Sequence, residues 1–353
     1  MSILLGVTGS VAGVYTGKLA EELEQLGHTV RIVFTSGFMV NFFELKRINK
    51  TIKIFNDSAE TWKKIGDPIL HIELRKWADI LIIAPLSMNT LAKIANGLCD
   101  NLLTEIVRAW DYSKPFIVCP SGNTMMIENE PTQEQISVLK NRGIKVLNQI
   151  EKTLACGDTG IGAMCHHQSI VDSLPCWSAP IKHEIFIPTG EHPGAFGAKR
   201  KYDIHTGVDI YCEEGKPVYA MEDGTIIEQG WFTGVSVKMP WWNDTRYLVI
   251  KGKSGCIVYG EIWEAKSIMD RRTNNIKVGQ LLGCVKAVLP PEKKRADIPH
   301  HSNAMLHIEL YDEKTKWSKS ASWVSWEHGQ KRDKHLMNPT PYLKSIKGVK
   351  HDS

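Results

Sequence analysis

The first half of the chain alternates short apolar runs with amphipathic segments. The apolar runs are typical of strands buried on both faces, and they cover Ile3–Val7, Thr29–Phe34, Ile80–Ala84, Phe116–Cys119 and Lys145–Leu147. Between them, apolar residues recur at helical spacing over Val14–Leu26, Ser87–Gly97 and Thr132–Arg142. Fully buried strands separated by helices predict a parallel, doubly wound α/β sheet. In such sheets, ligands bind at the carboxyl ends of the strands.

The pattern changes after residue 178. Prolines punctuate residues 179–200, which predicts a linker and entry segment. Beyond it, short β-type runs separated by turns cover Pro217–Ala220, Gly224–Glu228, Tyr247–Lys251, Cys256–Glu261, Leu281–Val285 and Met305–Leu310. This pattern predicts an antiparallel all-β domain. We therefore divide the chain into an α/β domain (1–178), the linker (179–200), a β-domain (201–345) and a tail (346–353).

Composition and charge exclude several classes of protein. The 353 residues are 42% apolar and 23% charged with a net charge of +4, which is ordinary for a soluble globular protein and too weak to indicate nucleic acid. No apolar run reaches the length of a membrane span, so no membrane partner is expected. The start, MSILLGVTGS, lacks the basic region and long apolar core of a secretory signal, which predicts a cytoplasmic location. The eight cysteines contain no CxxC pair and are expected to remain thiols.

Two small polar turns follow the first two expected strands. The first contains Gly9, Ser10 and Val11, and the second contains Thr35 and Ser36. Free backbone amides where a strand turns into a helix bind anions such as phosphate. Because the chain has no GxGxxG fingerprint here, the two turns favour a phosphate-bearing cofactor other than a dinucleotide.

Longer motifs then make the prediction specific. The segments are His71–Asp79, Ala84–Leu103, Pro120–Met126 and Cys156–Met164. In this order they resemble the flavin-containing cysteine decarboxylases, and most closely the phosphopantothenoylcysteine decarboxylases of coenzyme A synthesis. The resemblance implies an FMN-binding subunit in a homotrimer, or a multiple of it, with the flavin at a subunit interface.

The same resemblance implies roles for individual residues. It gives catalytic roles to His71, Asn123 and Cys156. Contacts to FMN are implied for Gly9, Ser10, Val11, Thr35, Ser36, Phe38, Ser87, Asn89, Thr90 and Asp100. Contacts to the substrate, a small-molecule or peptide thiol, are implied for Asn101, Met126, Gly157, Ala163 and Met164.

The chemistry explains why a flavin is needed. Loss of carboxylate from a cysteine amide leaves a carbanion with no electron sink, and flavin oxidation of the thiol to a thioaldehyde creates that sink. The resemblance places His71 near the carboxylate, gives Asn123 the task of holding the carboxylate or amide, and puts Cys156 on a flap that supplies a proton late in turnover. We therefore expect FMN-dependent decarboxylation of 4'-phosphopantothenoylcysteine to 4'-phosphopantetheine.

Two positions depart from the family pattern and leave alternatives open. Gly122 stands where the family has Met, and Ile127 stands where it has Trp. A smaller residue 122 would open room for a larger substrate, so a second interpretation is decarboxylation of the C-terminal cysteine of a peptide held by the β-domain. A third interpretation, from another class, is a regulatory or binding flavoprotein without catalysis.

The second half contains a candidate metal site. His205 and Asp209 lie four residues apart, and His307 lies on an expected strand, which together make a zinc ligand set with one open position. The surrounding segments Gly215–Ala220, Val278–Gly283 and Asn338–Leu343 resemble those of lysostaphin-type (LytM-like) zinc endopeptidases over about residues 185–345. The resemblance implies Zn²⁺ held by these three residues. The two catalytic histidines of that family are replaced by Met305 and Glu261, so we expect no peptidase activity.

Overall fold

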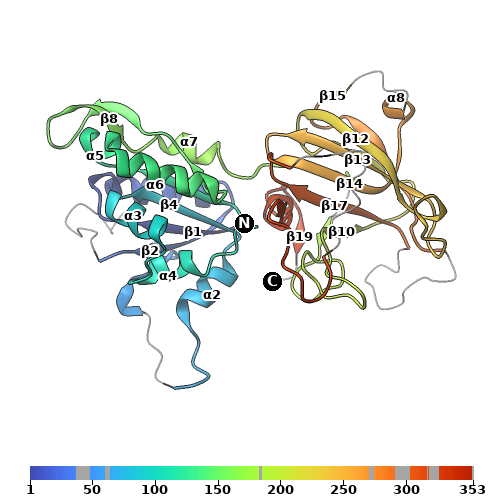
Figure 1. Cartoon of the computed structure of the whole chain (residues 1–353), viewed down its shortest axis with the longest axis horizontal. Helices are drawn as coiled ribbons and strands as arrows, with labels where there is room; N and C mark the ends of the chain where they lie inside the picture. Colours follow the sequence, from blue (N-terminus) through green and yellow to red (C-terminus); the bar gives the residue numbers. More distant parts are fainter. Residues whose placement is uncertain are drawn as a thin grey trace. The chain divides into compact units, whose positions relative to one another are not determined.

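The chain forms two compact units, Met1–Leu174 and Pro175–Ser353, in a computed structural model (Figure 1). The structure describes residues 1–36, 48–59, 64–182, 185–269, 274–290, 303–315, 317 and 326–351. Phe38, one of the predicted FMN contacts, lies outside these residues. Within the described ranges, no helix has the length and apolar character needed to cross a membrane.

A parallel sheet of six strands forms the centre of the first unit. The strands are β1 (Ser2–Val7), β2 (Thr29–Phe34), β3 (Lys53–Phe55), β4 (Ile80–Leu86), β5 (Phe116–Pro120) and β6 (Lys145–Val146). Their order in the sheet is β3-β2-β1-β4-β5-β6, and every neighbouring pair is parallel. The predicted parallel doubly wound sheet is therefore confirmed. The strand order reverses between β1 and β4, which is where such folds bind ligands.

Helices cover both faces of this sheet (Figure 1). They are η1 (Val11–Tyr15), α1 (Thr16–Gln25), η4 (Asp57–Ala59), α2 (Leu70–Trp77), α3 (Met88–Asn96), α4 (Leu102–Arg108), α5 (Thr124–Glu128), α6 (Glu130–Asn141) and α7 (His167–Val171). Alternate residues of β1 explain the two layers. Ile3 and Leu5 pack with α1 and α7, whereas Leu4 packs with α2, α3, α4 and α6. A separate antiparallel hairpin, β7 (Ile150–Thr153) and β8 (Thr159–Ala163), completes the unit.

The second unit is built on an antiparallel sheet, as the sequence predicts. Its strands are β10 (Val208–Tyr211), β11 (Pro217–Tyr219), β12 (Gly224–Thr233), β13 (Thr245–Gly252), β14 (Gly255–Glu264), β15 (Asn275–Ile276), β16 (Leu281–Val285), β17 (Met305–Tyr311) and β18 (Leu336–Met337). The main path runs β10-β17-β14-β13-β12-β15, with β16 joining β11 to β14 and β18 pairing with β17. Short helical turns η5 (Val235–Val237), α8 (Lys266–Met269) and α9 (Thr340–Leu343) connect or flank these strands.

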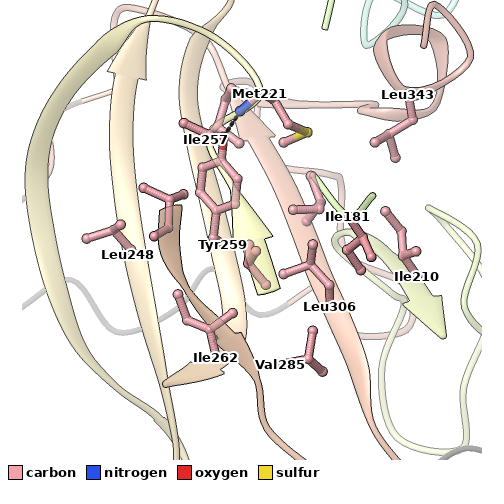
Figure 2. Close-up of a cluster of buried hydrophobic side chains, with 14 of the residues drawn as sticks. Ile181, Ile210, Met221, Leu248, Ile257, Tyr259, Ile262, Val285, Leu306 and Leu343 are labelled. Atoms are coloured by element: carbon pink, nitrogen blue, oxygen red, sulfur yellow. Dashed lines mark hydrogen bonds between the residues drawn. The ribbon is translucent and has the colours of Figure 1, made fainter. Parts of the chain in front are cut away.

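The core of the second unit surrounds Tyr259 (Figure 2). Its ring is fully buried among aliphatic side chains, and its hydroxyl accepts a hydrogen bond of 2.9 Å from the backbone amide of Met221. The stretch expected to be a linker also contributes, since Ile181 and Ile187 are buried in this core. Strand β9 (Phe186–Ile187) pairs in parallel with β19 (Lys350–His351), so part of the expected tail belongs to the same unit.

Candidate functional site

A cavity of about 940 Å³ lies at the carboxyl ends of β1 and β4 in the first unit. Most residues predicted to contact flavin or substrate line it: Gly9, Ser10, Val11, Thr35, Ser36, Ser87, Asn89, Thr90, Asn101, Asn123, Met126, Cys156, Ala163 and Met164. These residues come from turns and helix starts far apart in the sequence. The sheet brings them together because the carboxyl ends of parallel strands share one edge.

Buried hydroxyls join the strand ends that border the cavity. The Thr8 hydroxyl donates to the carbonyl of Pro85 at 2.9 Å and accepts from the amide of Ser87 at 2.7 Å. The Ser10 hydroxyl donates to that of Ser121 at 3.1 Å. These contacts connect the ends of β1, β4 and β5, so the floor of the cavity is held by several strands rather than by one loop.

The donors around the cavity fit a phosphate-bearing cofactor. Backbone amides of the turn at Gly9–Val11, several hydroxyls and the lysines Lys18, Lys93 and Lys152 surround it. Its volume lies within the range of cofactor pockets. Sequence reasoning missed the three lysines, although Lys18 lies on α1, after the first polar turn, and Lys93 lies on α3, which begins after Ser87.

Asp100 pairs with a lysine beside the cavity. It lies outside the lining of the cavity within the described residues, and its carboxylate pairs with the ammonium of Lys93 at 2.7 Å. The hydrogen bond from Lys93 lowers the pKa of Asp100. Asp100 therefore pairs with a lysine that lines the cavity, and its own contact with FMN stays a prediction.

Asn123 and Cys156 meet at the cavity, as the predicted site requires. The Asn123 amide donates to the Cys156 sulfur at 3.3 Å and to Asp158 Oδ2 at 2.7 Å. The Cys156 thiol in turn donates to the same oxygen of Asp158 at 3.3 Å. Sequence reasoning missed Asp158, whose only signal was its place two residues after the cysteine in the same turn. Gly157 lies in that exposed turn with φ of 92° and does not line the cavity within the described residues.

Glycines allow the β7–β8 hairpin, which carries Cys156, to approach the Asn123 loop. The amide of Gly122 donates to the carbonyl of Gly162 at 3.0 Å. A Cβ on Gly162 would stand 2.3 Å from the Gly122 carbonyl oxygen, and one on Gly160 would stand 2.5 Å from the Thr124 hydroxyl. Close approach of the two segments therefore requires glycine at both hairpin positions.

The expected extra room at Gly122 is limited by its neighbours. A Cβ at this position would stand 3.2 Å from Met88 Cγ and 3.6 Å from Ile127 Cδ1. The side chain of Ile127 is itself buried. The small residue at position 122 thus accommodates the packing of Met88 and Ile127, which weakens the argument for a larger substrate.

His71 does not meet the other two predicted catalytic residues within one chain. It lies in the first turn of α2, and its Nδ1 is 3.5 Å from Glu105 Oε2 of α4. It is not among the described residues that line the cavity. The histidine is therefore presented on a part of the unit different from the one that carries Asn123 and Cys156.

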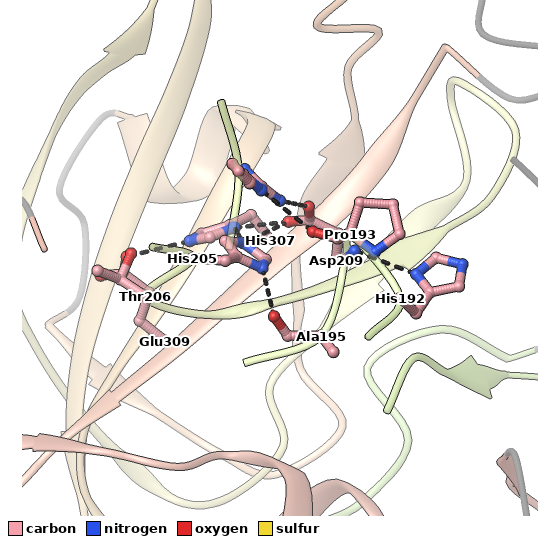
Figure 3. A network of polar contacts seen from close by, with 10 residues as sticks. His192, Pro193, Ala195, His205, Thr206, Asp209, His307 and Glu309 are labelled. Atoms are coloured by element: carbon pink, nitrogen blue, oxygen red, sulfur yellow. Dashed lines mark hydrogen bonds and ion pairs between the residues drawn. The ribbon is translucent and has the colours of Figure 1, made fainter. Parts of the chain in front are cut away.

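The second unit brings its three predicted metal ligands together (Figure 3). Asp209 on β10 and His307 on β17 are directly opposite each other in the antiparallel register. Asp209 Oδ1 lies 2.7 Å from His307 Nδ1 and 3.2 Å from His205 Nε2. Tetrahedral zinc, with bonds of about 2.0–2.1 Å, spaces its ligand atoms about 3.3 Å apart. The cluster therefore has a spacing close to that of a zinc site.

Outer contacts aim both imidazoles inward. His205 donates from Nδ1 to the carbonyl of Ala195 at 3.0 Å, which leaves its Nε2 lone pair for the cluster. His307 donates from Nε2 to Glu309 Oε1 at 3.1 Å, which leaves Nδ1 for the cluster. Such carbonyl and carboxylate partners orient metal-binding histidines in proteins. Gly207 permits this packing, because a Cβ there would stand 2.7 Å from the His307 ring.

The buried charges of the cluster shift several pKa values. Burial opposes the imidazolium of His307, but hydrogen bonds to Asp209 and Glu309 outweigh it and raise its pKa to about 10. Burial raises the pKa of Glu261 to about 8, and the charge of Asp209 adds to this effect. The guanidinium of Arg200 pairs with Asp209 Oδ2, opposite the oxygen that faces the histidines. Several shifted pKa values within one cluster are typical of functional sites.

A model of the flavoprotein family matches residues 1–177, half of the chain. The chain belongs to the flavoprotein family. This flavoprotein is 48% identical over 197 residues to "Phosphopantothenoylcysteine decarboxylase" of Oryza sativa subsp. japonica, which covers 54% of the chain and 88% of the relative. The Mus musculus protein of the same name is 42% identical over 169 residues, covering 48% of the chain and 83% of the relative. A solved structure described as the FMN binding protein AtHal3 is 46% identical, covers 49% of this flavoprotein and 93% of that chain, and has a TM-score of 0.46.

Proposed function

We propose that the first unit catalyses FMN-dependent decarboxylation of 4'-phosphopantothenoylcysteine to 4'-phosphopantetheine, a step of coenzyme A synthesis. The observation that carries this proposal is the 48% identity to a phosphopantothenoylcysteine decarboxylase across 88% of that relative's length. The cavity supports it, since the residues that line it include Asn123 and Cys156. The identity and the cavity together support a carboxy-lyase that acts on a small-molecule thiol.

The residues of the cavity fit FMN. The amides and hydroxyls of Gly9–Val11, with Lys18 and Lys93, would hold its phosphate, and the apolar lining would receive its ring system. When bound, FMN would take two electrons from the substrate to create the electron sink for decarboxylation, and would return the same two electrons to the decarboxylated product to give phosphopantetheine.

The chain's own groups divide the remaining work. The Asn123 amide points at the thiol of Cys156 and would position the cysteinyl end of the substrate beside it. The Cys156 thiol, which donates to Asp158 at the edge of the cavity, would deliver a proton late in turnover. The hairpin that holds Cys156 also lines part of the cavity and would limit access of water to the reacting atoms.

Completion of the site requires a second copy of the chain. Because His71 lies away from the lining of its own cavity, we propose that it serves the cavity of a neighbouring subunit in a homotrimer or a multiple of it. Its contact with Glu105 fixes the ring on the surface formed by α2 and α4. The molecular mass of the native protein in solution tests this assembly, and a monomer with full activity would contradict it.

The experiment that tests the proposed reaction compares two substrates on the FMN-loaded chain. Carbon dioxide release is measured with phosphopantothenoylcysteine and with a peptide that ends in cysteine. We expect release from the first and loss of that release in His71→Asn. Release from the peptide alone would support the tailoring interpretation, and a flavin-loaded protein that turns over neither would support a regulatory one.

A second candidate function, zinc binding by the second unit, rests on the cluster of His205, Asp209 and His307. The ligand atoms lie within 4.8 Å of one another, and all three side chains are buried. Metal analysis of the purified chain should find zinc in the wild type and a loss of it in His307→Ala. Equal zinc content in the two proteins would refute this site.

A further inference from the structure

Glu261 is a buried carboxylate in the second unit that the proposed zinc site does not use. Its side chain is 8% exposed, and its Oε2 has no hydrogen-bond partner among the described residues. Buried carboxylates in proteins are hydrogen-bonded, paired with a cation or bound to a metal. An oxygen without any of these partners therefore indicates a ligand that completes its surroundings.

The backbone places this carboxylate beside the metal cluster. Gly260 lies directly opposite His307 in the register of β14 and β17, and Glu261 follows it. On the other side of β14, Tyr259 pairs with Leu248, and Ile262 pairs with Arg246. Between these pairs, Gly260 and Glu261 of β14 lie opposite the single residue Tyr247 of β13. This extra residue is a β-bulge, and bulges redirect side chains near functional sites.

The local conformation is also unusual. Glu261 has φ of 62°, a left-handed conformation that costs free energy for a residue with a Cβ. Strain of this kind persists where the surrounding structure imposes it, and it gathers at functional sites.

We infer that Glu261 supplies a fourth protein ligand to the metal held by His205, Asp209 and His307, which closes the site. The inference rests on the zinc binding proposed above. Glu261 is not in the set of atoms that lie within 4.8 Å of one another, so the inference requires its side chain to turn toward the ion. Two carboxylates and two neutral imidazoles balance the charge of a divalent cation.

A closed site has a different use from an open one. Catalytic zinc keeps one position for water or substrate, whereas structural zinc is held by four protein ligands. With Glu261 in the fourth position, the metal stabilises the junction of β10, β14 and β17 and cannot polarise a peptide bond. Met305, at the position where the resemblance to zinc endopeptidases implies a catalytic histidine, agrees with this use.

Cobalt(II) reports the coordination directly, because its visible absorption depends on the number and kind of its ligands. The full chain is loaded with Co²⁺ and titrated with azide, an anion that binds to an open metal position. We expect azide to leave the absorption spectrum of the wild type unchanged. In Glu261→Ala we expect an azide-dependent spectrum and a Zn²⁺ affinity lower by at least about tenfold, because one ligand is replaced by water.

Two further variants keep the test decisive. Glu261→Gln preserves the side-chain shape, so it reports metal affinity even if the alanine variant unfolds. Glu264→Gln is the matched control, because Glu264 is a buried acid of the same strand that pairs with Arg246 and should leave the cobalt spectrum and azide response unchanged. Flavin content and carbon dioxide release by the first unit should stay at the wild-type level in every variant.

The outcomes separate this inference from the zinc proposal. A wild-type cobalt spectrum that responds to azide, with wild-type zinc affinity in Glu261→Gln and Glu261→Ala, overturns the role of Glu261 and leaves the three-ligand site standing. Absence of bound zinc and cobalt in the wild type overturns both. Retained metal in Glu261→Ala with a new azide response supports the closed site.

Discussion

Gly162 shows how a single residue without a side chain shapes the candidate active site. It lies on β8 against the loop that carries Asn123, and its carbonyl accepts the hydrogen bond from Gly122. The thiol of Cys156 reaches Asn123 only because this approach is close. The absence of a side chain at Gly162 is therefore as important to the candidate site as the side chains of Asn123 and Cys156.

The change Gly162→Ala should separate the hairpin from the Asn123 loop. The added methyl would stand 2.3 Å from the carbonyl oxygen of Gly122, so something must shift. We expect destabilisation of about 1–3 kcal/mol in urea unfolding, typical of overpacking, together with a clear fall in kcat.

Gly157→Ala provides the matched control for this variant. A Cβ on Gly157 meets nothing within 4 Å, so only its positive φ opposes the change. Because this φ strains an alanine by itself, stability does not decide between the two variants, whereas a fall of kcat in Gly157→Ala as large as in Gly162→Ala would contradict the role of close packing at Gly162.

His28 makes folding sensitive to acid. Burial lowers its pKa to about 4, whereas the unfolded value is about 6.5. The folded state therefore binds fewer protons between these values, and the stability from the neutral ring, complete above pH 6.5, is lost as pH falls toward 4. In His28→Gln, urea unfolding at several pH values should show a shallower loss of stability over this window. An unchanged slope would contradict this prediction.

At the scale of elements, the sequence predicted the strands and helices whose position is set by the pattern of hydrophobic residues. Strands buried on both faces, such as Ile80–Leu86, appear as continuous apolar runs and were predicted nearly to their ends. The hairpin of β7 and β8 was missed, because its residues are largely exposed and its second strand is rich in glycine. Its position depends on contacts with residues 122–124, which local pattern does not record.

In the candidate sites too, the sequence predicted features set by local residues and missed those set by tertiary structure. Local turns and family motifs predicted most of the cavity lining, because those residues follow directly from strand ends. Neither pattern nor spacing could show that His71 lies away from this lining, since that depends on the path of α2. The metal cluster was predictable in composition, whereas its geometry comes from the register that sets Asp209 opposite His307.

Helix α3 begins at the candidate site and depends on a distant arginine at its other end. The Arg142 guanidinium donates to the carbonyls of Ile94 and Ala95 at 2.7 and 2.6 Å. These charge-assisted bonds add to the capping of the helix, where the Ile94 carbonyl also accepts from the amide of Gly97, and they match the helix dipole. Arg142→Met should lower the free energy of unfolding by about 1–3 kcal/mol, whereas Lys140→Met, on the exposed side of α6, should change it little. Equal effects of the two changes in urea unfolding would contradict this role.

At the scale of the whole molecule, two units of different architecture share one chain. The flavoprotein family match ends at residue 177, near the boundary of the first unit at Leu174. The residues of the candidate decarboxylase site all lie in the first unit, and the metal cluster lies in the second. The side chains named for the proposed reaction therefore all come from the first unit.

Shared sites in the proposed homotrimer can be tested by mixing inactive variants. His71→Asn and Asn123→Ala should each lack decarboxylation. If His71 serves the cavity of a neighbour, trimers reassembled from both variants contain interfaces with both residues intact and should regain part of the activity. Separately assembled variants mixed without exchange serve as the control. Reassembled trimers without any activity would place His71 and Asn123 in the same subunit's site.

The most direct test of the central claim measures carbon dioxide and phosphopantetheine together, with the FMN-loaded chain and phosphopantothenoylcysteine. The wild type should form the two products in a one-to-one ratio. Cys156→Ser should release carbon dioxide without phosphopantetheine, because the proton for the last step is missing. Wild-type release of carbon dioxide no greater than that of His71→Asn would contradict the account.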